Sequence, residues 1–372
     1  MDAPHLRNGI GCAKVWVLKP RKAGESVMSK VTTIGLDLAK NVFQVHGADE
    51  QGKRVYTKRL KRGQVLEFFA QHPIARVGME ACGGAYDWAR RIEALGHEVK
   101  LMAPQHVKPY VIGNKTDARD ARGIAEAAAR ASVPALALRS EESQQCTVLH
   151  TVRSQWMKQR IACANEMRGL LAEFGEIVPK GMKQFRAHVN AALERLRPRL
   201  PLFAGVLDDM LEQLRKFEEN IAKLEGQIKQ LHVNSPASRL IEGICGVGVL
   251  SATAVVARYG GCENFDSSRK FASAIGLTPK EHSSGDKQMR LGISKRGDPY
   301  VRYLLIHGAR SVLKVRMNNP AYQDDWVVRV ARRRGVNIAV VALAAKNARR
   351  IWAMLRTGEL FDPNHGKALV PA

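Results

Sequence analysis

The first third of the chain alternates short apolar segments with helical patterns. Residues 31–38 form an apolar, β-branched run that predicts a buried strand, and residues 41–47 and 54–59 predict two shorter strands joined by a polar turn. A helix, a strand, a second helix and a second strand are then predicted over residues 65–71, 75–79, 86–95 and 98–102. Three consecutive strands followed by this alternation predict an α/β domain, a mixed sheet covered by helices.

Beyond residue 117 the pattern turns helical and stays so as far as Pro236. Its clearest part carries two series of apolar residues, each repeating every seven positions. The series are Leu207, Leu214, Ile221 and Ile228, and Met210, Phe217, Leu224 and Leu231. This pattern predicts a coiled coil that could link copies of the chain. An ordinary amphipathic helix packed on its own domain is the alternative.

The last part of the chain predicts a further, mainly helical unit. Residues 236–330 are rich in glycine turns and basic side chains, and an apolar helix is predicted over 338–345, between two clusters of Arg and Lys. Four segments are therefore expected. They are a basic extension without fixed structure over 1–30, an α/β domain over 31–165, helical coiled-coil sequence over 166–235 and a C-terminal domain over 236–372.

The charge balance indicates the kind of partner. The 372 residues include 59 Lys and Arg against 35 Asp and Glu, a formal net charge of +24, which attracts polyanions and makes nucleic acid the leading partner. No apolar run reaches the 18 or so residues that a membrane span requires. The six cysteines are scattered without a zinc-binding spacing, so we expect a reduced, cytoplasmic protein with neither a zinc site nor a disulfide framework.

Four carboxylates stand out in the first half. Asp37 lies near the end of the first predicted strand, and Glu80 directly follows a later one. Asp117 and Asp120 are spaced i, i+3 behind Thr116, which can cap a helix, so both carboxylates share one helix face. Grouped carboxylates repel one another unless divalent cations neutralise them, and hard oxygen ligands suit Mg²⁺. Alternatively, each acid is an ordinary helix-start charge or a solvated residue at the sheet's rim.

A glycine-rich turn precedes the predicted helix over 249–258. Gly243, Gly246 and Gly248 would expose backbone N–H groups at the start of that helix, which suits a phosphate. A grip on the DNA backbone like that of a helix-hairpin-helix motif fits the net charge. A tight turn between two helices, without a ligand, is the alternative.

A loop with two adjacent serines, Ser283 and Ser284, lies within a basic segment. The surrounding cations are Lys287, Arg290, Lys295, Arg296 and Arg302. A serine hydroxyl in such a loop could attack a phosphodiester while cations stabilise the charged transition state. Ser-Ser-Gly is also a common turn sequence. Whichever holds for the serines, the cations predict a phosphate-binding surface.

In this order, the motifs resemble the DEDD class of insertion-sequence transposases, relatives of the Piv DNA invertase. The resemblance extends from about residue 28 to the C-terminal domain. Its motifs lie at residues 34–40, 78–81, 114–121, 243–248, 276–279, 284–285 and 295–297. It implies a RuvC-like fold of the RNase H superfamily for the first domain, and a transposase domain at the C-terminus.

The resemblance also implies a chemistry. Asp37, Glu80, Asp117 and Asp120 would be catalytic residues that bind Mg²⁺, two ions per site, and Ser284, with Ser283 beside it, would join covalently to DNA. Gly246, Gly248, Arg290, Lys295, Arg296 and Arg302 are the candidate contacts to nucleic acid. A non-coding RNA from the element would guide the protein, which would act as a dimer or tetramer linked by the coiled coil, at the bacterial nucleoid.

Two other functions remain open on the sequence. One is a metal-dependent junction resolvase or nuclease in which water attacks the phosphate instead of a serine. The other is a non-catalytic nucleic-acid-binding scaffold in which the acids only balance local charge.

Overall fold

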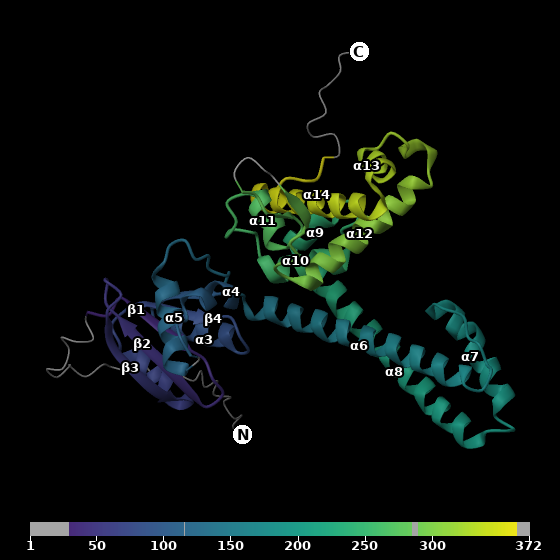
Figure 1. Cartoon of the computed structure of the whole chain (residues 1–372), viewed down its shortest axis with the longest axis horizontal. Coiled ribbons are helices and arrows are strands. Elements are labelled where there is room, and N and C mark those ends of the chain that lie inside the picture. The colour runs from purple at the N-terminus through teal and green to yellow at the C-terminus, as the bar shows by residue number, and fades with distance from the viewer. Residues whose placement is uncertain (1–29, 115, 285–288, 363–372) are drawn as a thin grey trace, which may run out of the picture. The chain divides into compact units, whose positions relative to one another are not determined.

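The computed structural model describes residues 30–114, 116–284 and 289–362. The chain divides into two compact units, Met1–Leu138 and Arg139–Ala372. Figure 1 shows the sheet in the first unit and the long helices in the second. The extension predicted over 1–30 lies almost entirely outside the described residues.

The first unit is built on a five-stranded sheet with the order β3-β2-β1-β4-β5. The central strand β1 (Thr33–Asp37) pairs antiparallel with β2 (Val42–Ala48), which pairs antiparallel with β3 (Arg54–Lys61). On its other side β1 pairs parallel with β4 (Arg76–Glu80), and β4 pairs parallel with β5 (Glu98–Met102). The mixed sheet predicted from the sequence is confirmed.

Helices cover the two faces of this sheet differently. One face carries Ile34, Leu36, Val77 and Met79, which form a buried core with α2 (Val65–Gln71) and α3 (Ala85–Glu93). The opposite face packs against α5 (Asp117–Ala129). The short helices η1, α4 and η2 span Arg62–Gln64, Pro104–Val107 and Lys108–Tyr110. This division follows from the two-residue period of a strand, which sends alternate side chains to opposite faces.

The second unit begins with three helices, α6 (Glu141–Ala172), α7 (Met182–Leu196) and α8 (Pro201–Asn234). The long helices α6 and α8 pack against each other within one chain. Leu207, Leu214, Ile221 and Ile228, the first heptad series, are all buried. The apolar seam of α8 is therefore covered inside a single copy of the protein.

Among the described residues, the remaining secondary structure of the second unit is helical apart from one two-stranded hairpin. Its core gathers Val255, Phe271, Leu305, Leu343 and Ile351. The helices around that core are α9 (Pro236–Glu242), α10 (Val249–Tyr259), α11 (Ser268–Ala274), α12 (Pro299–Met317), η3 (Pro320–Tyr322), α13 (Trp326–Arg334) and α14 (Val336–Thr357). The hairpin strands are β6 (Pro279–Glu281) and β7 (Arg290–Ile293). Within the described chain, no helix is long and apolar enough to span a bilayer.

The structure divides the chain earlier than the sequence predicts. The expected boundary at 165/166 falls inside α6, a single continuous helix, whereas the compact units separate between Leu138 and Arg139. Helix α6 packs on α8 and on α10, both in the second unit. Apolar periodicity does not reveal this boundary, because it marks helices and not the units to which they belong.

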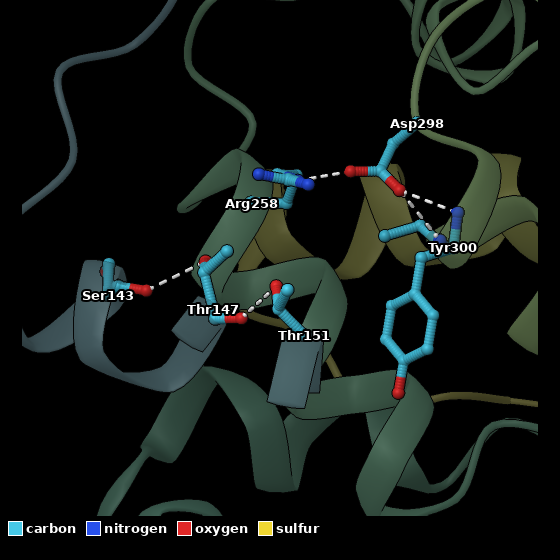
Figure 2. A network of polar contacts seen from close by, with 7 residues as sticks. Ser143, Thr147, Thr151, Arg258, Asp298 and Tyr300 are labelled. Atoms are coloured by element: carbon cyan, nitrogen blue, oxygen red, sulfur yellow. Dashed lines mark hydrogen bonds and ion pairs between the residues drawn. The ribbon is translucent and has the colours of Figure 1, made fainter. Parts of the chain in front are cut away.

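A buried histidine joins α6 to the rest of the second unit. The Nε2 of His150 lies 3.0 Å from the Thr253 hydroxyl, and its Nδ1 lies 3.1 Å from the Tyr300 hydroxyl. Thr253 donates its own proton to the Val249 carbonyl, so Nε2–H donates to Thr253 and Nδ1 accepts from Tyr300. Close by, Asp298 pairs with Arg258 and caps α12 by accepting from the backbone of Tyr300 (Figure 2).

These contacts suit a neutral imidazole. Burial, assisted by the positive charges of Arg153 and Arg258, lowers the pKa of His150 to about 4. The unfolded chain would protonate this residue near pH 6.5, so between these two values the unfolded state binds more protons than the folded one. The contribution of neutral His150 to the free energy of unfolding is therefore present above about pH 6.5 and is lost as the pH falls toward 4.

We expect wild-type protein to lose about 2 kcal/mol more unfolding free energy between pH 7 and pH 5 than His150→Gln loses. Glutamine can keep hydrogen bonds at this position but takes up no proton. Urea unfolding at both pH values measures the difference. Equal losses in the two proteins would contradict this role for His150.

Candidate active site

The ends of two adjacent parallel strands carry Asp37 and Glu80. Leu36 of β1 pairs with Met79 of β4, so the next residues, Asp37 and Glu80, lie at the same end of the sheet, and both are half-buried. Desolvation raises the pKa of the Cys82 thiol, and the charges of Glu80 and Asp37 raise it further. Both carboxylates are therefore close enough to the Cys82 thiol to affect its pKa.

The start of α5 supplies two more carboxylates. The Thr116 hydroxyl caps this helix by accepting a hydrogen bond of 3.3 Å from the Arg119 backbone, which fixes the first turn. Asp117 and Asp120 lie in that turn, and each offers an oxygen to a group that includes Asp37. The three oxygens all lie within 4.8 Å of one another. The i, i+3 spacing places both helix acids on one face of α5, and the packing of α5 on the sheet brings that face to the end of β1.

Two glycines in the sheet allow α5 to come this close. A Cβ on Gly35 of β1 would lie 2.0 Å from the Ala121 carbonyl oxygen and 2.6 Å from the Ala125 nitrogen. A Cβ on Gly78 of β4 would lie 2.4 Å from the Ala128 side chain. Neither strand position can hold a side chain while α5 keeps its place. We did not predict this role, although a glycine in each of two apolar strands is a recognised sign of close approach.

The arrangement fits a divalent cation. Carboxylates this close repel one another, and a hard cation with oxygen ligands relieves that repulsion. Oxygens around one Mg²⁺ lie up to about 4 Å apart, so small side-chain rotations would bring all three into one coordination sphere. Glu80 is not part of the group within 4.8 Å. It lies at the neighbouring strand end, where it could complete the site or hold a second ion.

The serines lie near the tip of the β6-β7 hairpin, and two of the sequence motifs form its base. The Ser294 nitrogen donates to the Thr278 carbonyl at 2.8 Å, and the Lys295 nitrogen donates to Gly276 at 3.2 Å. A Cβ on Gly276, where φ is +78°, would lie 2.1 Å from the Arg296 carbonyl oxygen. The segments around 276–279 and 295–297 are therefore two stems held together through their backbones.

The described residues that follow β6 are exposed to solvent. Ser283 and Ser284 are both exposed, and the His282 nitrogen donates to the Met289 carbonyl at 3.0 Å. The Ser283 hydroxyl donates to a Glu281 carboxylate oxygen at 2.9 Å. This bond ties Ser283 to strand β6. Gly285, the second residue of the predicted Ser-Gly motif, lies outside the described residues.

The glycine turn before α10 has a packing role. Gly246 adopts φ +88°, and a Cβ there would lie 2.9 Å from the carbonyl group of Gly308 on α12. A Cβ on Gly308 would in turn lie 1.8 Å from the Gly246 oxygen. The turn and α12 thus contact each other through their backbones. This packing is the kind expected of a tight turn between two helices, the alternative named in the sequence analysis. Gly248 has open space around its Cβ position and is the N-cap residue directly before α10.

The predicted phosphate contacts differ in their surroundings. Arg302 donates to the carbonyls of Ile275 at 2.9 Å and Arg296 at 3.0 Å, so its guanidinium braces the hairpin base. Lys295 and Arg296 are exposed on one stem and remain available to a ligand. Arg290 belongs to β7, and its side chain lies outside the described part of the chain.

We expect Gly35→Ala to force α5 away from the sheet. Overpacking of this kind lowers the free energy of unfolding by about 1–3 kcal/mol. Displaced acids should also weaken divalent-metal binding by about 10–100-fold. Urea unfolding and calorimetric metal titration measure the two effects.

Gly63→Ala is the matched control, because open space surrounds the Cβ position of Gly63 in the same unit. Metal affinity in Gly35→Ala equal to that of the control would show that the contact between α5 and β1 does not build the site.

Comparison with known proteins gives consistent matches in both units. Residues 34–175 match a family model for transposases of the DEDD, IS110 type, and residues 238–326 match the transposase IS116/IS110/IS902 family. A probable family 20 transposase of Pseudomonas aeruginosa is 44% identical over 340 residues, covering 90% of this chain and 99% of the relative. The transposase for insertion sequence element IS1111A of Coxiella burnetii is 40% identical over 364 residues, 97% and 99% of the two chains. The transposase for insertion sequence element IS1328 of Yersinia enterocolitica is 35% identical over 339 residues, 90% and 100% of the two chains.

Proposed function

Because the chain belongs to the IS116/IS110/IS902 family of transposases, which cleave and transfer DNA strands, we propose that it mobilises its insertion sequence through a covalent phosphoserine intermediate. The observation that carries the proposal is the convergence of Asp37, Asp117 and Asp120 within 4.8 Å. Such a group has no function in merely holding a polyanion, since it would repel the DNA backbone. It suits a reaction at a phosphate instead.

The carboxylates would act by holding Mg²⁺, which supplies neutralisation of the negative charge on the scissile phosphate. Asp37, Asp117 and Asp120 are the ligands supported by distance, and Glu80 is the fourth candidate, at the neighbouring strand end. The contact of α5 with Gly35 holds the backbone that carries Asp117 and Asp120 against β1 before any ligand arrives. Rigid support of this kind reduces the reorganisation required in the transition state.

Ser284 would supply the nucleophile. Its Oγ attacks the phosphorus, a serine–phosphate bond forms, and the bond from phosphorus to the deoxyribose oxygen breaks. The hydroxyl proton of the serine is given up and the departing deoxyribose oxygen takes up a proton, so the step is balanced. A hydroxyl on a second DNA end then attacks the phosphoserine and restores Ser284, without an external energy source.

We also propose that an RNA from the element guides the protein and that the working form is a homo-oligomer. The net charge of +24 supports binding of a second nucleic acid beside the DNA. The buried heptad series of α8 is already used within one chain. The oligomer would therefore use other surfaces of α6, α7 and α8. On α8, for example, Leu202 and Val206 are 88% and 55% exposed.

A nuclease that uses water is the second candidate function. One observation favours it, because the first unit alone brings three acids together and water could attack at such a site without a serine. That reaction would leave free DNA ends and no bond between protein and DNA.

The direct test is incubation with element-end DNA, RNA transcribed from the element end and Mg²⁺, followed by a denaturing gel. We expect a DNA-linked protein band that disappears in Ser284→Ala and persists in Ser283→Ala. Cleavage without any linked protein would favour the nuclease. Loss of the band in Ser283→Ala alone would identify Ser283 as the nucleophile instead of Ser284.

The metal site is tested by Asp120→Asn. We expect the metal concentration required for half-maximal cleavage to rise about tenfold or more, because a neutral amide is a weaker ligand for a hard cation. Asp87→Asn is the control, an acid on α3 that forms an ion pair with Arg91, 3.6 Å away. Indistinguishable metal curves for the two variants would remove Asp120 from the site.

A further inference from the structure

A hollow of about 400 Å³ lies at the base of the serine hairpin. Three separate elements form it, since Arg269 comes from α11, Arg349 from α14, and Pro279 and Glu281 from β6. Helices α11 and α14 pack against each other, so the two arginines come from a fixed pair of helices. The hollow and the β6-β7 hairpin therefore share residues and lie in the same unit.

The two arginines differ from the cations around them. On α14, the Lys346 ammonium lies 4.9 Å from the centre of the Trp326 ring, and Arg350 lies 4.8 Å from that of Phe361. By contrast, Arg269 and Arg349 are exposed and form no hydrogen bond or ion pair among the residues that the structure describes. Two guanidinium groups thus face the hollow with their donors available.

The remaining lining suits a nucleotide. Ala272 and Leu277 are buried, Ala345 is half-buried, and together they give the hollow an apolar floor beside the Thr278 hydroxyl. Guanidinium groups bind phosphate through paired, charge-assisted hydrogen bonds, and an apolar floor can cover the face of a sugar. The lining has one acid, Glu281, and its carboxylate accepts a hydrogen bond from the Ser283 hydroxyl.

We propose that this hollow binds one phosphate and its sugar on the DNA strand that Ser284 attacks. The proposal rests on the function proposed above. Ser284 follows Glu281 by three residues, which is at most about 10 Å of extended chain. Successive phosphates of one strand rise about 3.4 Å along duplex DNA, so the bound phosphate lies within about three nucleotides of the scissile one. Arg269 and Arg349 are positioning residues that hold the strand in register with the serine.

The test replaces single phosphates by neutral methylphosphonates, one position at a time, on both sides of the cleavage site. With wild-type protein, one position within about three nucleotides should lower the yield of DNA-linked protein about tenfold, the expected cost of losing a charge-assisted contact. In the double variant Arg269→Ala/Arg349→Ala, yield on unmodified DNA should fall by a similar factor. The same methylphosphonate should then cause no further loss.

The matched control is Arg332→Ala/Arg333→Ala, which removes two exposed arginines from α13 in the same unit. It should keep the wild-type pattern of sensitivity to methylphosphonates. If wild-type protein forms the adduct but no flanking phosphate matters, or if the sensitive position remains sensitive in Arg269→Ala/Arg349→Ala, this inference is wrong while the proposed function stands. If wild-type protein forms no adduct on any DNA, the proposed function itself fails.

Discussion

The close contact of α5 with the central strands is the constraint on which the acidic site depends. A helix usually packs on a sheet through side chains, which fill the space between the two backbones. Here Gly35 and Gly78 place no side chain in that space, and residues of α5 occupy it directly against β1 and β4. Asp117 and Asp120 can reach the end of β1 only because the first turn of α5 comes this close. Packing and chemistry are thus fixed by the same two glycines.

The serine hairpin follows a similar principle in the second unit. Gly276 and Gly297 have positive φ. A Cβ on Gly276 would overlap the Arg296 backbone of the opposite stem, and a Cβ on Gly297 would overlap the Ala274 carbonyl at the end of α11. Arg302 links the end of α11 to the second stem through the carbonyl groups of Ile275 and Arg296. A short hairpin of only two strands would be weak alone, but this base holds it against the helical core. The exposed serines that follow β6 are thus carried on a fixed base.

Much of this arrangement is predictable from the sequence, for definable reasons. Strand alternation gives the mixed sheet, and the i, i+3 spacing behind Thr116 correctly places two acids on one helix face. The sequence alone leaves two roles open for Gly246, because a phosphate cradle and a tight helix contact require the same positive φ. The uses of Arg302 and of the α8 heptads also depend on residues distant in the chain. Sequence spacing identifies candidate groups, whereas tertiary packing decides what each of them contacts.

The central claim is that one carboxylate site forms where α5 meets the end of β1. The most direct measurement is a crystal structure of the protein with Mn²⁺ and element-end DNA, using the anomalous signal to locate the metal. The account predicts an anomalous peak bounded by the carboxylates of Asp37, Asp117 and Asp120, with a DNA phosphate beside it. A peak bound by other side chains, with these three acids turned away from it, would contradict the account.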